Sequence, residues 1–264
     1  MLELQNLEYE ILRDKVVRDF SLKVGAGEVV TLFGASGCGK TTILRLISGL
    51  IDPRKGKIIN KFNKTTYLFQ ENRLLEWKNA LENVLLVMDE PDEKTVLQLF
   101  SRLGLTGKDA LKYPDELSGG MRQRVAFVRA IVTKPDLLLM DEPFSGLDYD
   151  MKEILIDIVS QRVSEGMSII LVTHDRMEAV KMSNRIYFLA NKGAVIQKEL
   201  VLDEAFKNRD FAFISKTIDE NFKGQIFAKK KYQPFKSADT TELIHYFVWA
   251  FMVRKVGLEP TCRR

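Results

Sequence analysis

The sequence has no long hydrophobic run. Its longest apolar stretches, Ser168–Thr173 and Leu243–Val253, are far shorter than the roughly 20 residues that a bilayer-spanning helix needs. The N-terminus has no basic segment followed by an apolar one, so we expect no secretion signal. There are 2 cysteines in 264 residues, which excludes a disulfide framework and favours a reducing compartment. These absences together predict a cytosolic protein.

The sequence also lacks a strong charge of one sign. The net charge is +4, but residues 223–264 hold nine of the 40 basic side chains against three acidic ones. The basic character therefore lies in the C-terminal tail, and we expect no nucleic-acid partner. Two interpretations of this tail stay open: a terminal helix that covers part of a sheet, or a membrane-surface contact through its basic and aromatic residues. We expect the last residues, Gly257–Arg264, to be disordered.

Hydrophobic patterning predicts an α/β fold. The first thirty residues alternate apolar and polar side chains, which predicts an N-terminal antiparallel β subdomain. A helical pattern from about residue 76 to residue 134 predicts an inserted helical subdomain. Elsewhere strands and helices alternate, and this βαβ order predicts a largely parallel sheet. We expect one domain over residues 1–222 and a tail over 223–264. The predicted strands are Glu28–Phe33, Leu137–Met140, Ser168–Val172 and Ile186–Leu189, and the predicted helices are Thr41–Leu50, Lys152–Ser164 and Arg176–Met182.

A glycine-rich loop lies between the first predicted buried strand and a helix. Its pattern is G-x4-G-K-[ST], in which glycines let successive N–H groups turn toward phosphate oxygens. Lys40 is expected to reach the β- and γ-phosphates, and the Thr41 hydroxyl to hold Mg²⁺. We predict ATP as the nucleotide, because no guanine-reading segment is visible. The predicted nucleotide contacts are Gly34, Ala35, Ser36, Gly37, Cys38, Gly39, Lys40, Thr41 and Thr42.

Two carboxylates follow the apolar strand Leu137–Met140. Asp141 stands where phosphoryl transfer needs a partner for Mg²⁺, and Glu142 suits the general base that activates the attacking water. An Asp-Glu pair after a strand is by itself usually a solvated strand end. Because the same chain also contains a phosphate-binding loop, we expect Asp141 and Glu142 to be functional rather than a solvated strand end.

A second anion-binding pattern occurs at Ser118–Gly120. Ser118 is a suitable helix N-cap, and Gly119 and Gly120 permit close backbone approach. One chain does not need two phosphate sites for one nucleotide, whereas a dimer does if each chain closes on the nucleotide of its partner. The pattern therefore predicts a homodimer, and the alternative interpretation is a capped helix with a flexible start.

Together these segments resemble the ATP-binding cassette ATPases, and the resemblance covers about residues 1–200. Gly34–Thr41 is similar to the Walker A motif and Leu137–Glu142 to Walker B. Ser118–Met121 is similar to the LSGGQ signature, with Met121 in place of glutamine. The resemblance implies a P-loop NTPase core of the RecA-like type, and ATP and Mg²⁺ as ligands.

Three further positions take their roles from the resemblance alone. Gln70 matches the Q-loop, whose glutamine approaches Mg²⁺ and relays the nucleotide state. Asp148 matches the D-loop at the dimer seam, and His174 matches the switch histidine that contacts the γ-phosphate. The implied catalytic residues are thus Glu142, His174 and Gln70, and the implied metal ligands are Thr41, Gln70 and Asp141.

The residue that stacks on adenine has more than one candidate. Alignment with the family places Ile11 or Leu12 near this position, while Tyr9 is the aromatic residue close by. We predict that Tyr9 stacks on adenine. The alternative is that adenine rests on an aliphatic side chain.

The resemblance also implies partners. Residues 69–84 look like the Q-loop segment of importers for nitrate, sulfonate and taurine, although Glu76 stands where proline is usual. The expected partners are transmembrane permease subunits and, indirectly, a periplasmic or surface solute-binding protein. The expected location is the cytoplasmic face of the inner membrane, as a peripheral subunit. The alternatives are an exporter or lipoprotein-release ATPase, and a non-transport relative that acts on DNA or ribosomes.

Overall fold

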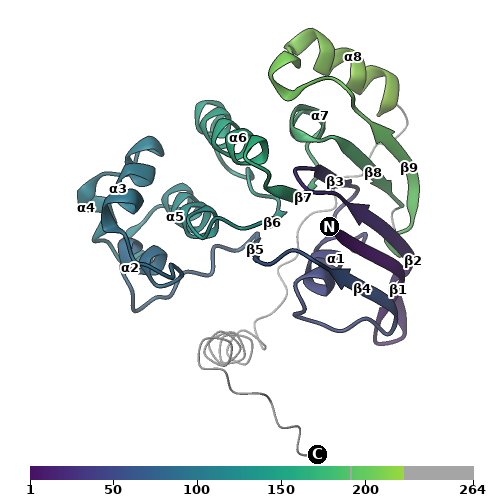
Figure 1. Ribbon diagram of the computed structural model, residues 1–264, viewed down its shortest axis with the longest axis horizontal. Coiled ribbons are helices and arrows are strands. Elements are labelled where there is room, and N and C mark those ends of the chain that lie inside the picture. The colour runs from purple at the N-terminus through teal and green to yellow at the C-terminus, as the bar shows by residue number, and fades with distance from the viewer. Residues whose placement is uncertain (191, 223–264) are drawn as a thin grey trace, which may run out of the picture. The chain divides into compact units, whose positions relative to one another are not determined.

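The computed structural model describes residues 1–190 and 192–222 (Figure 1). The predictions made for the tail, residues 223–264, lie outside the described residues.

An antiparallel sheet forms the N-terminal part, as the alternation of apolar residues predicts. Its strand order is β2-β1-β4, and β1 pairs with both neighbours in antiparallel register. The third strand was not predicted, because the sequence Lys-Gly-Lys-Ile-Ile-Asn does not alternate and lies at the sheet edge. The strands are β1 (Leu2–Ile11), β2 (Asp14–Val24) and β4 (Lys55–Asn60).

The second sheet has six strands in the order β5-β6-β7-β3-β8-β9. All neighbouring pairs are parallel except β8 and β9, which are antiparallel. The α/β fold with a largely parallel sheet is therefore confirmed. The terminal strands β5 and β9 were not predicted, since short edge strands carry weak patterns. The bounds are β3 (Val29–Phe33), β5 (Thr65–Leu68), β6 (Leu137–Asp141), β7 (Ser168–Thr173), β8 (Arg185–Leu189) and β9 (Ile196–Val201).

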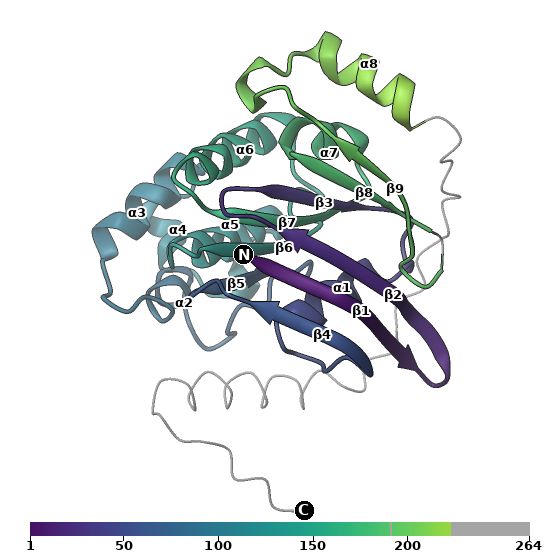
Figure 2. The ribbon, with the colours of Figure 1, turned by 45° about the vertical axis from the view of Figure 1, so that its right-hand side comes forward.

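The chain between β5 and β6 is helical, which confirms the inserted helical segment (Figures 1 and 2). The predicted helix Thr41–Leu50 is shorter than expected and covers Lys40–Ile47, because Gly49 takes a left-handed φ of 71° that a continuing helix does not permit. The helices are α1 (Lys40–Ile47), α2 (Ala80–Leu85), α3 (Glu93–Arg102), α4 (Gly107–Ala110), η1 (Pro114–Glu116), α5 (Gly119–Ile131), α6 (Tyr149–Ser164), α7 (Arg176–Met182), η2 (Phe206–Asn208) and α8 (Phe211–Asn221).

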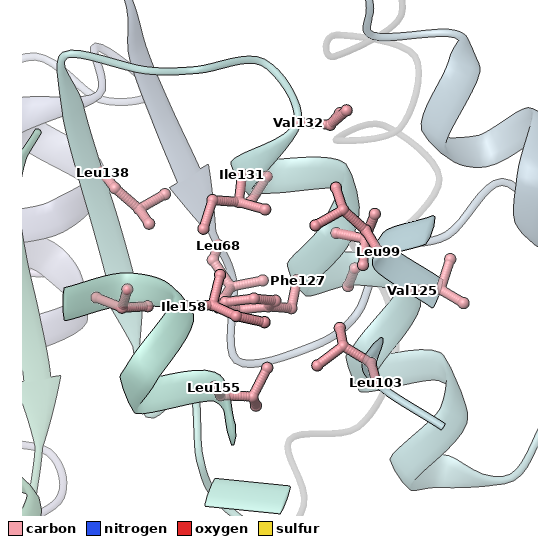
Figure 3. Close-up of a cluster of buried hydrophobic side chains, with 14 of the residues drawn as sticks. Leu68, Leu99, Leu103, Val125, Phe127, Ile131, Val132, Leu138, Leu155 and Ile158 are labelled. Atoms are coloured by element: carbon pink, nitrogen blue, oxygen red, sulfur yellow. The ribbon is translucent and has the colours of Figure 1, made fainter. Parts of the chain in front are cut away.

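The two faces of the six-stranded sheet carry separate cores. Leu137 and Leu139 of β6 join the core that also contains α1 and the antiparallel sheet. Leu138 and Met140 point to the other face and pack with α5, α6 and the inserted helices. Figure 3 shows this second core, in which Phe127 of α5 lies among side chains of both helices and strands. Strands that are buried on both faces read as continuous apolar runs, which explains why β6 and β7 were predictable.

None of the helices in residues 1–190 and 192–222 combines the length and the hydrophobicity that a membrane-spanning segment needs.

Candidate functional site

The phosphate-binding loop connects β3 to α1, as the sequence predicts. Gly39 is the N-cap of α1 and has a φ of 110°. A Cβ atom added there would lie 2.6 Å from the carbonyl oxygen of Val16. Both the backbone angle and the lack of space therefore require glycine. No side chain caps the start of α1, so its first N–H groups are available to an anion.

Lys40 lies within the loop itself. Its Nζ donates to the carbonyl oxygens of Gly34 and Ala35, both at 2.8 Å, and lies 3.9 Å from Cys38 Sγ. Its side chain is buried, so the ammonium is already held at the loop before any ligand arrives. Burial raises the pKa of the Cys38 thiol, which keeps this side chain neutral beside an anion site. The loop is thus built to receive an anion.

Asp141 ends β6 and is almost completely buried. Its Oδ2 accepts a hydrogen bond from the Tyr67 hydroxyl at 3.3 Å, while Oδ1 has no hydrogen-bond partner among the described residues. Burial raises the pKa of Asp141, the neighbouring Glu142 raises it further, and the Thr41 hydroxyl lowers it. A buried carboxylate oxygen without a partner, next to a threonine hydroxyl, fits a hard cation such as Mg²⁺.

The described residues contain no group of three or more His, Cys, Asp and Glu side chains that could hold a metal ion by themselves. Mg²⁺ is usually bound by one or two protein oxygens together with substrate phosphates, and Asp141 and Thr41 offer such oxygens. Thr41, Gln70 and Asp141 are the residues that would hold it.

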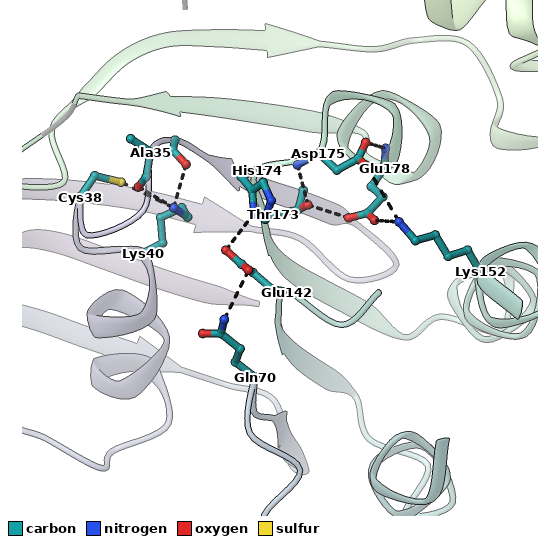
Figure 4. A network of polar contacts seen from close by, with 11 residues as sticks. Ala35, Cys38, Lys40, Gln70, Glu142, Lys152, Thr173, His174, Asp175 and Glu178 are labelled. Carbon is teal, nitrogen blue, oxygen red and sulfur yellow. Dashed lines mark hydrogen bonds and ion pairs between the residues drawn. The ribbon is translucent and has the colours of Figure 1, made fainter. Parts of the chain in front are cut away.

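Three polar side chains meet beyond the ends of adjacent parallel strands. Gln70 follows β5, Glu142 follows β6 and His174 follows β7, and the sheet order β5-β6-β7 places these ends side by side. Glu142 Oε1 lies 3.0 Å from His174 Nδ1, and Glu142 Oε2 accepts from Gln70 Nε2 at 3.4 Å (Figure 4). Ligands of open parallel sheets bind at such carboxyl ends. The arrangement suits a base, Glu142, that is oriented from two sides.

Ser118 caps α5, as predicted. Its Oγ accepts a hydrogen bond from the backbone N–H of Met121 at 3.2 Å. A Cβ atom added at Gly119 or Gly120 would meet nothing within 4 Å. The start of α5 is thus an open surface in the single chain, and packing within this chain does not explain why glycine stands at either position.

Asp148 is the N-cap of α6. Its Oδ1 accepts from the backbone N–H of Met151 at 2.9 Å, so the residue has a local structural role in addition to the one expected at a dimer seam.

The candidates for the adenine contact differ in exposure. Tyr9 is half-buried and packs against the core between the two sheets. Leu12 is 95% exposed and has a positive φ of 48° at the turn between β1 and β2, and Ile11 is also exposed. The contact of Tyr9 with adenine stays a prediction.

Two side chains that support this site, Tyr67 and Arg129, were not predicted from the sequence. Tyr67 binds Asp141, and its pKa is raised above the usual range by burial and by that carboxylate. Arg129 of α5 donates to the carbonyl oxygens of Asn72 at 2.8 Å and Arg73 at 2.9 Å, next to Gln70. No local pattern reveals such pairs, because their partners are distant in the sequence.

Comparisons with known proteins agree with this geometry. Residues 17–145 match the family model described as ABC transporter. The chain is 40% identical over 195 residues to the uncharacterized ABC transporter ATP-binding protein YtlC of Bacillus subtilis (strain 168), covering 69% of this chain and 75% of that protein. It is 38% identical over 199 residues to the aliphatic sulfonates import ATP-binding protein SsuB 1 of Rhodococcus jostii (strain RHA1), covering 73% of this chain and 80% of that protein.

A solved structure shares the fold. The ATP-binding cassette MJ0796, in a dimeric post-hydrolysis state bound to ADP and Pi, superposes with a TM-score of 0.70 at 27% sequence identity. The superposition covers 78% of this chain and 100% of that chain.

The fold and the site define a P-loop nucleotide hydrolase, with a phosphate-binding loop beside a carboxylate pair at the ends of parallel strands. The chain belongs to the ABC transporter family and is an ATP-binding subunit with ATPase activity.

Proposed function

We propose that this ATPase drives the import of a small solute of the sulfonate, nitrate or taurine type through a membrane permease. Two copies bind two ATP molecules at their shared interface, as a peripheral assembly on the cytoplasmic face of the inner membrane. A solute-binding protein delivers the solute to the other side of the permease. Support for the solute class comes from relatives named as aliphatic sulfonates import proteins, at 35% to 38% identity.

The geometry of the site supports the hydrolytic roles that we propose for these residues. Lys40 and the loop Gly34–Gly39 would hold the phosphates. Thr41, Gln70 and Asp141 would hold Mg²⁺, which would supply positive charge to neutralise the charge that develops on the phosphates. Glu142 takes the proton of the attacking water, and His174 steadies the γ-phosphate.

The observation that carries this proposal is the meeting of Gln70, Glu142 and His174 within hydrogen-bond range. Each residue lies at the end of a different strand, so the contact is a property of the fold. Gln70 also begins the segment that leads to the inserted helices. Hydrolysis of the γ-phosphate next to Glu142 would therefore alter the position of those helices through the Gln70–Glu142 hydrogen bond.

An exposed apolar surface on the inserted helical segment supports the permease partner. Trp77 is 60% exposed and Tyr113 is 46% exposed, and a backbone hydrogen bond of 2.9 Å from Ala80 N to Lys112 O joins their two segments. Exposed aromatic side chains on neighbouring segments are typical of surfaces that bind another protein.

The first experiment tests the coupling and the solute. The gene is deleted in the source organism, and uptake of labelled taurine, an alkanesulfonate and nitrate is compared with uptake after restoring the wild-type chain or Glu142→Gln. We expect wild-type, but not Glu142→Gln, to restore uptake of one of these solutes. Normal uptake of all three in the deletion strain would contradict the importer proposal, and a defect in efflux would favour the exporter alternative.

The second experiment tests Glu142 directly. Purified Glu142→Gln should bind ATP like the wild type but release phosphate about 10²- to 10⁴-fold more slowly, the range expected for a general base. Unchanged turnover would remove Glu142 from this role.

A further inference from the structure

Glu178 of α7 is a buried carboxylate that is not among the predicted nucleotide-binding residues. It is 7% exposed. Its Oε2 accepts from the Thr173 hydroxyl at 2.6 Å, and its Oε1 accepts from Lys152 Nζ at 2.9 Å (Figure 4). Burial raises the pKa of Glu178, and Asp175 raises it further, while Thr173 and Lys152 lower it. Burying a charged pair is costly and seldom adds net stability, so a positional role is the better explanation for it.

The Thr173 hydroxyl fixes the backbone around His174. While it donates to Glu178, it also accepts from the backbone N–H of Asp175 at 3.0 Å. The two residues that flank His174 are therefore tied to each other. The ring of His174 extends from this closed turn to Glu142, with Nδ1 3.0 Å from Oε1.

Lys152 connects this turn to α6. The helix begins directly after Asp148, its N-cap, so Lys152 lies one turn into the helix. A second ion pair, Glu153 with Lys181, joins the same two helices but is more exposed and has no bond to Thr173.

We propose that Glu178, held by Lys152, is a positioning residue that orients His174 against Glu142 through the Thr173 hydroxyl. By the same contacts the Lys152–Glu178 pair connects the start of α6, next to the expected dimer seam, to the hydrolytic centre. A partner subunit that displaces Asp148 would then change the position of His174. The inference rests on the role proposed for His174 in hydrolysis.

The test compares Glu178→Ala with Glu153→Ala in the full 264-residue chain. Steady-state phosphate release gives kcat and KM for ATP, and thermal unfolding shows whether each variant is folded. For Glu178→Ala we expect kcat to fall about 10- to 100-fold with KM unchanged, the range for losing the partner that orients an active group. For Glu153→Ala, which breaks an ion pair between the same helices, we expect both constants to be unchanged. Equal effects of the two variants would overturn the proposal.

A double variant separates positioning from general damage. In the His174→Ala background, Glu178→Ala should lower kcat by less than about two-fold, because residues that act through one another are not additive. A full 10- to 100-fold further loss would overturn the proposal. If His174→Ala alone keeps wild-type turnover, the role of His174 itself fails. If His174→Ala loses turnover and Glu178→Ala keeps it, only the inference about Glu178 fails.

Thr173 supplies a second test if Glu178→Ala does not fold. Thr173→Val keeps the shape but removes the hydroxyl, and Thr173→Ser keeps the hydroxyl. We expect Thr173→Val to lower kcat like Glu178→Ala and Thr173→Ser to retain most of the activity. Equal turnover of the two variants would overturn the proposal.

Discussion

At the scale of the residue, the buried carboxylate of Asp141, which we predict to bind Mg²⁺, lowers the stability of the nucleotide-free protein. The carboxylate is 2% exposed, and one of its oxygens has no hydrogen-bond partner among the described residues. Water would solvate this charge in the unfolded chain, so folding carries the cost of desolvating it. The raised pKa of Asp141 expresses that cost.

Asp141→Asn should therefore stabilise the nucleotide-free protein at pH 7. Because the folded-state pKa is raised, the folded chain binds this proton more tightly than the unfolded chain does. The free energy of unfolding of the wild type is thus highest below the unfolded-state pKa of Asp141. It falls as the pH rises through the folded-state pKa, because the side chain then becomes charged while buried. The asparagine variant avoids this loss and should melt higher, by roughly 2–4 °C for each kcal/mol.

Thermal melts without Mg²⁺ at several pH values measure this difference in melting temperature, which should shrink as the pH falls toward 3.8, the ordinary pKa of an aspartate side chain. The same variant should lose Mg²⁺-dependent ATP hydrolysis. A variant that is less stable than wild type at pH 7 would contradict the argument.

At the scale of the element, side chains of α5 bind both loops that carry the predicted catalytic residues Gln70 and Glu142. Arg129 binds the carbonyl oxygens of Asn72 and Arg73, and Gln123 Nε2 donates to Pro143 O at 2.6 Å, directly after Glu142. Arg73 has a positive φ of 45°, a strained conformation for a residue other than glycine. Burial lowers the pKa of Arg129 to about 10, so it remains charged at neutral pH.

Arg129→Met should loosen the segment that carries Gln70. Methionine fills the space but leaves two carbonyl groups without their donor, at a cost of about 1–3 kcal/mol for each buried group that stays unsatisfied. Hydrogen exchange measured by mass spectrometry should be faster at residues 69–74, and turnover should fall.

Arg124→Met is the matched control on the same helix, since Arg124 binds Leu103 O and Gly120 O. It should leave exchange at residues 69–74 unchanged. Equal exchange in the two variants would show that Arg129 does not hold this segment.

At the scale of the whole molecule, the open start of α5 argues for a second subunit. Gly119 has no neighbour that a Cβ would touch, and its φ is not in the left-handed region, so this chain alone does not require glycine there. A nucleotide held by a second copy would supply the missing neighbour, because helix N-termini bind phosphate.

Gly119→Val should leave the stability of the subunit within about 0.5 kcal/mol, as at other open surface sites. In the Glu142→Gln background, however, it should abolish ATP-dependent dimerisation, which sedimentation velocity with and without ATP measures. Gly107→Val is the control, because Gly107 also starts a helix with nothing within 4 Å. It should leave the dimer intact. A dimer that forms equally well with Gly119→Val would contradict the two-subunit site.

The sequence by itself determined the features that depend only on residues adjacent in the chain. The loop Gly34–Thr41 and the pair Asp141 and Glu142 were predictable, because a contiguous segment specifies its own turn and because buried strands have continuous apolar runs. The edge strands β4, β5 and β9 were missed, since they lack such runs.

Only the tertiary structure decided which distant residues meet. The sheet order β5-β6-β7-β3 differs from the order along the chain, and it brings Gln70, Glu142 and His174 together. Glu178 and Arg129 look like ordinary helical side chains until their partners, Lys152 and the carbonyls of residues 72 and 73, are placed beside them. Local patterns record burial and turns, whereas contacts between elements depend on how strands are ordered and helices pack, which no short segment encodes.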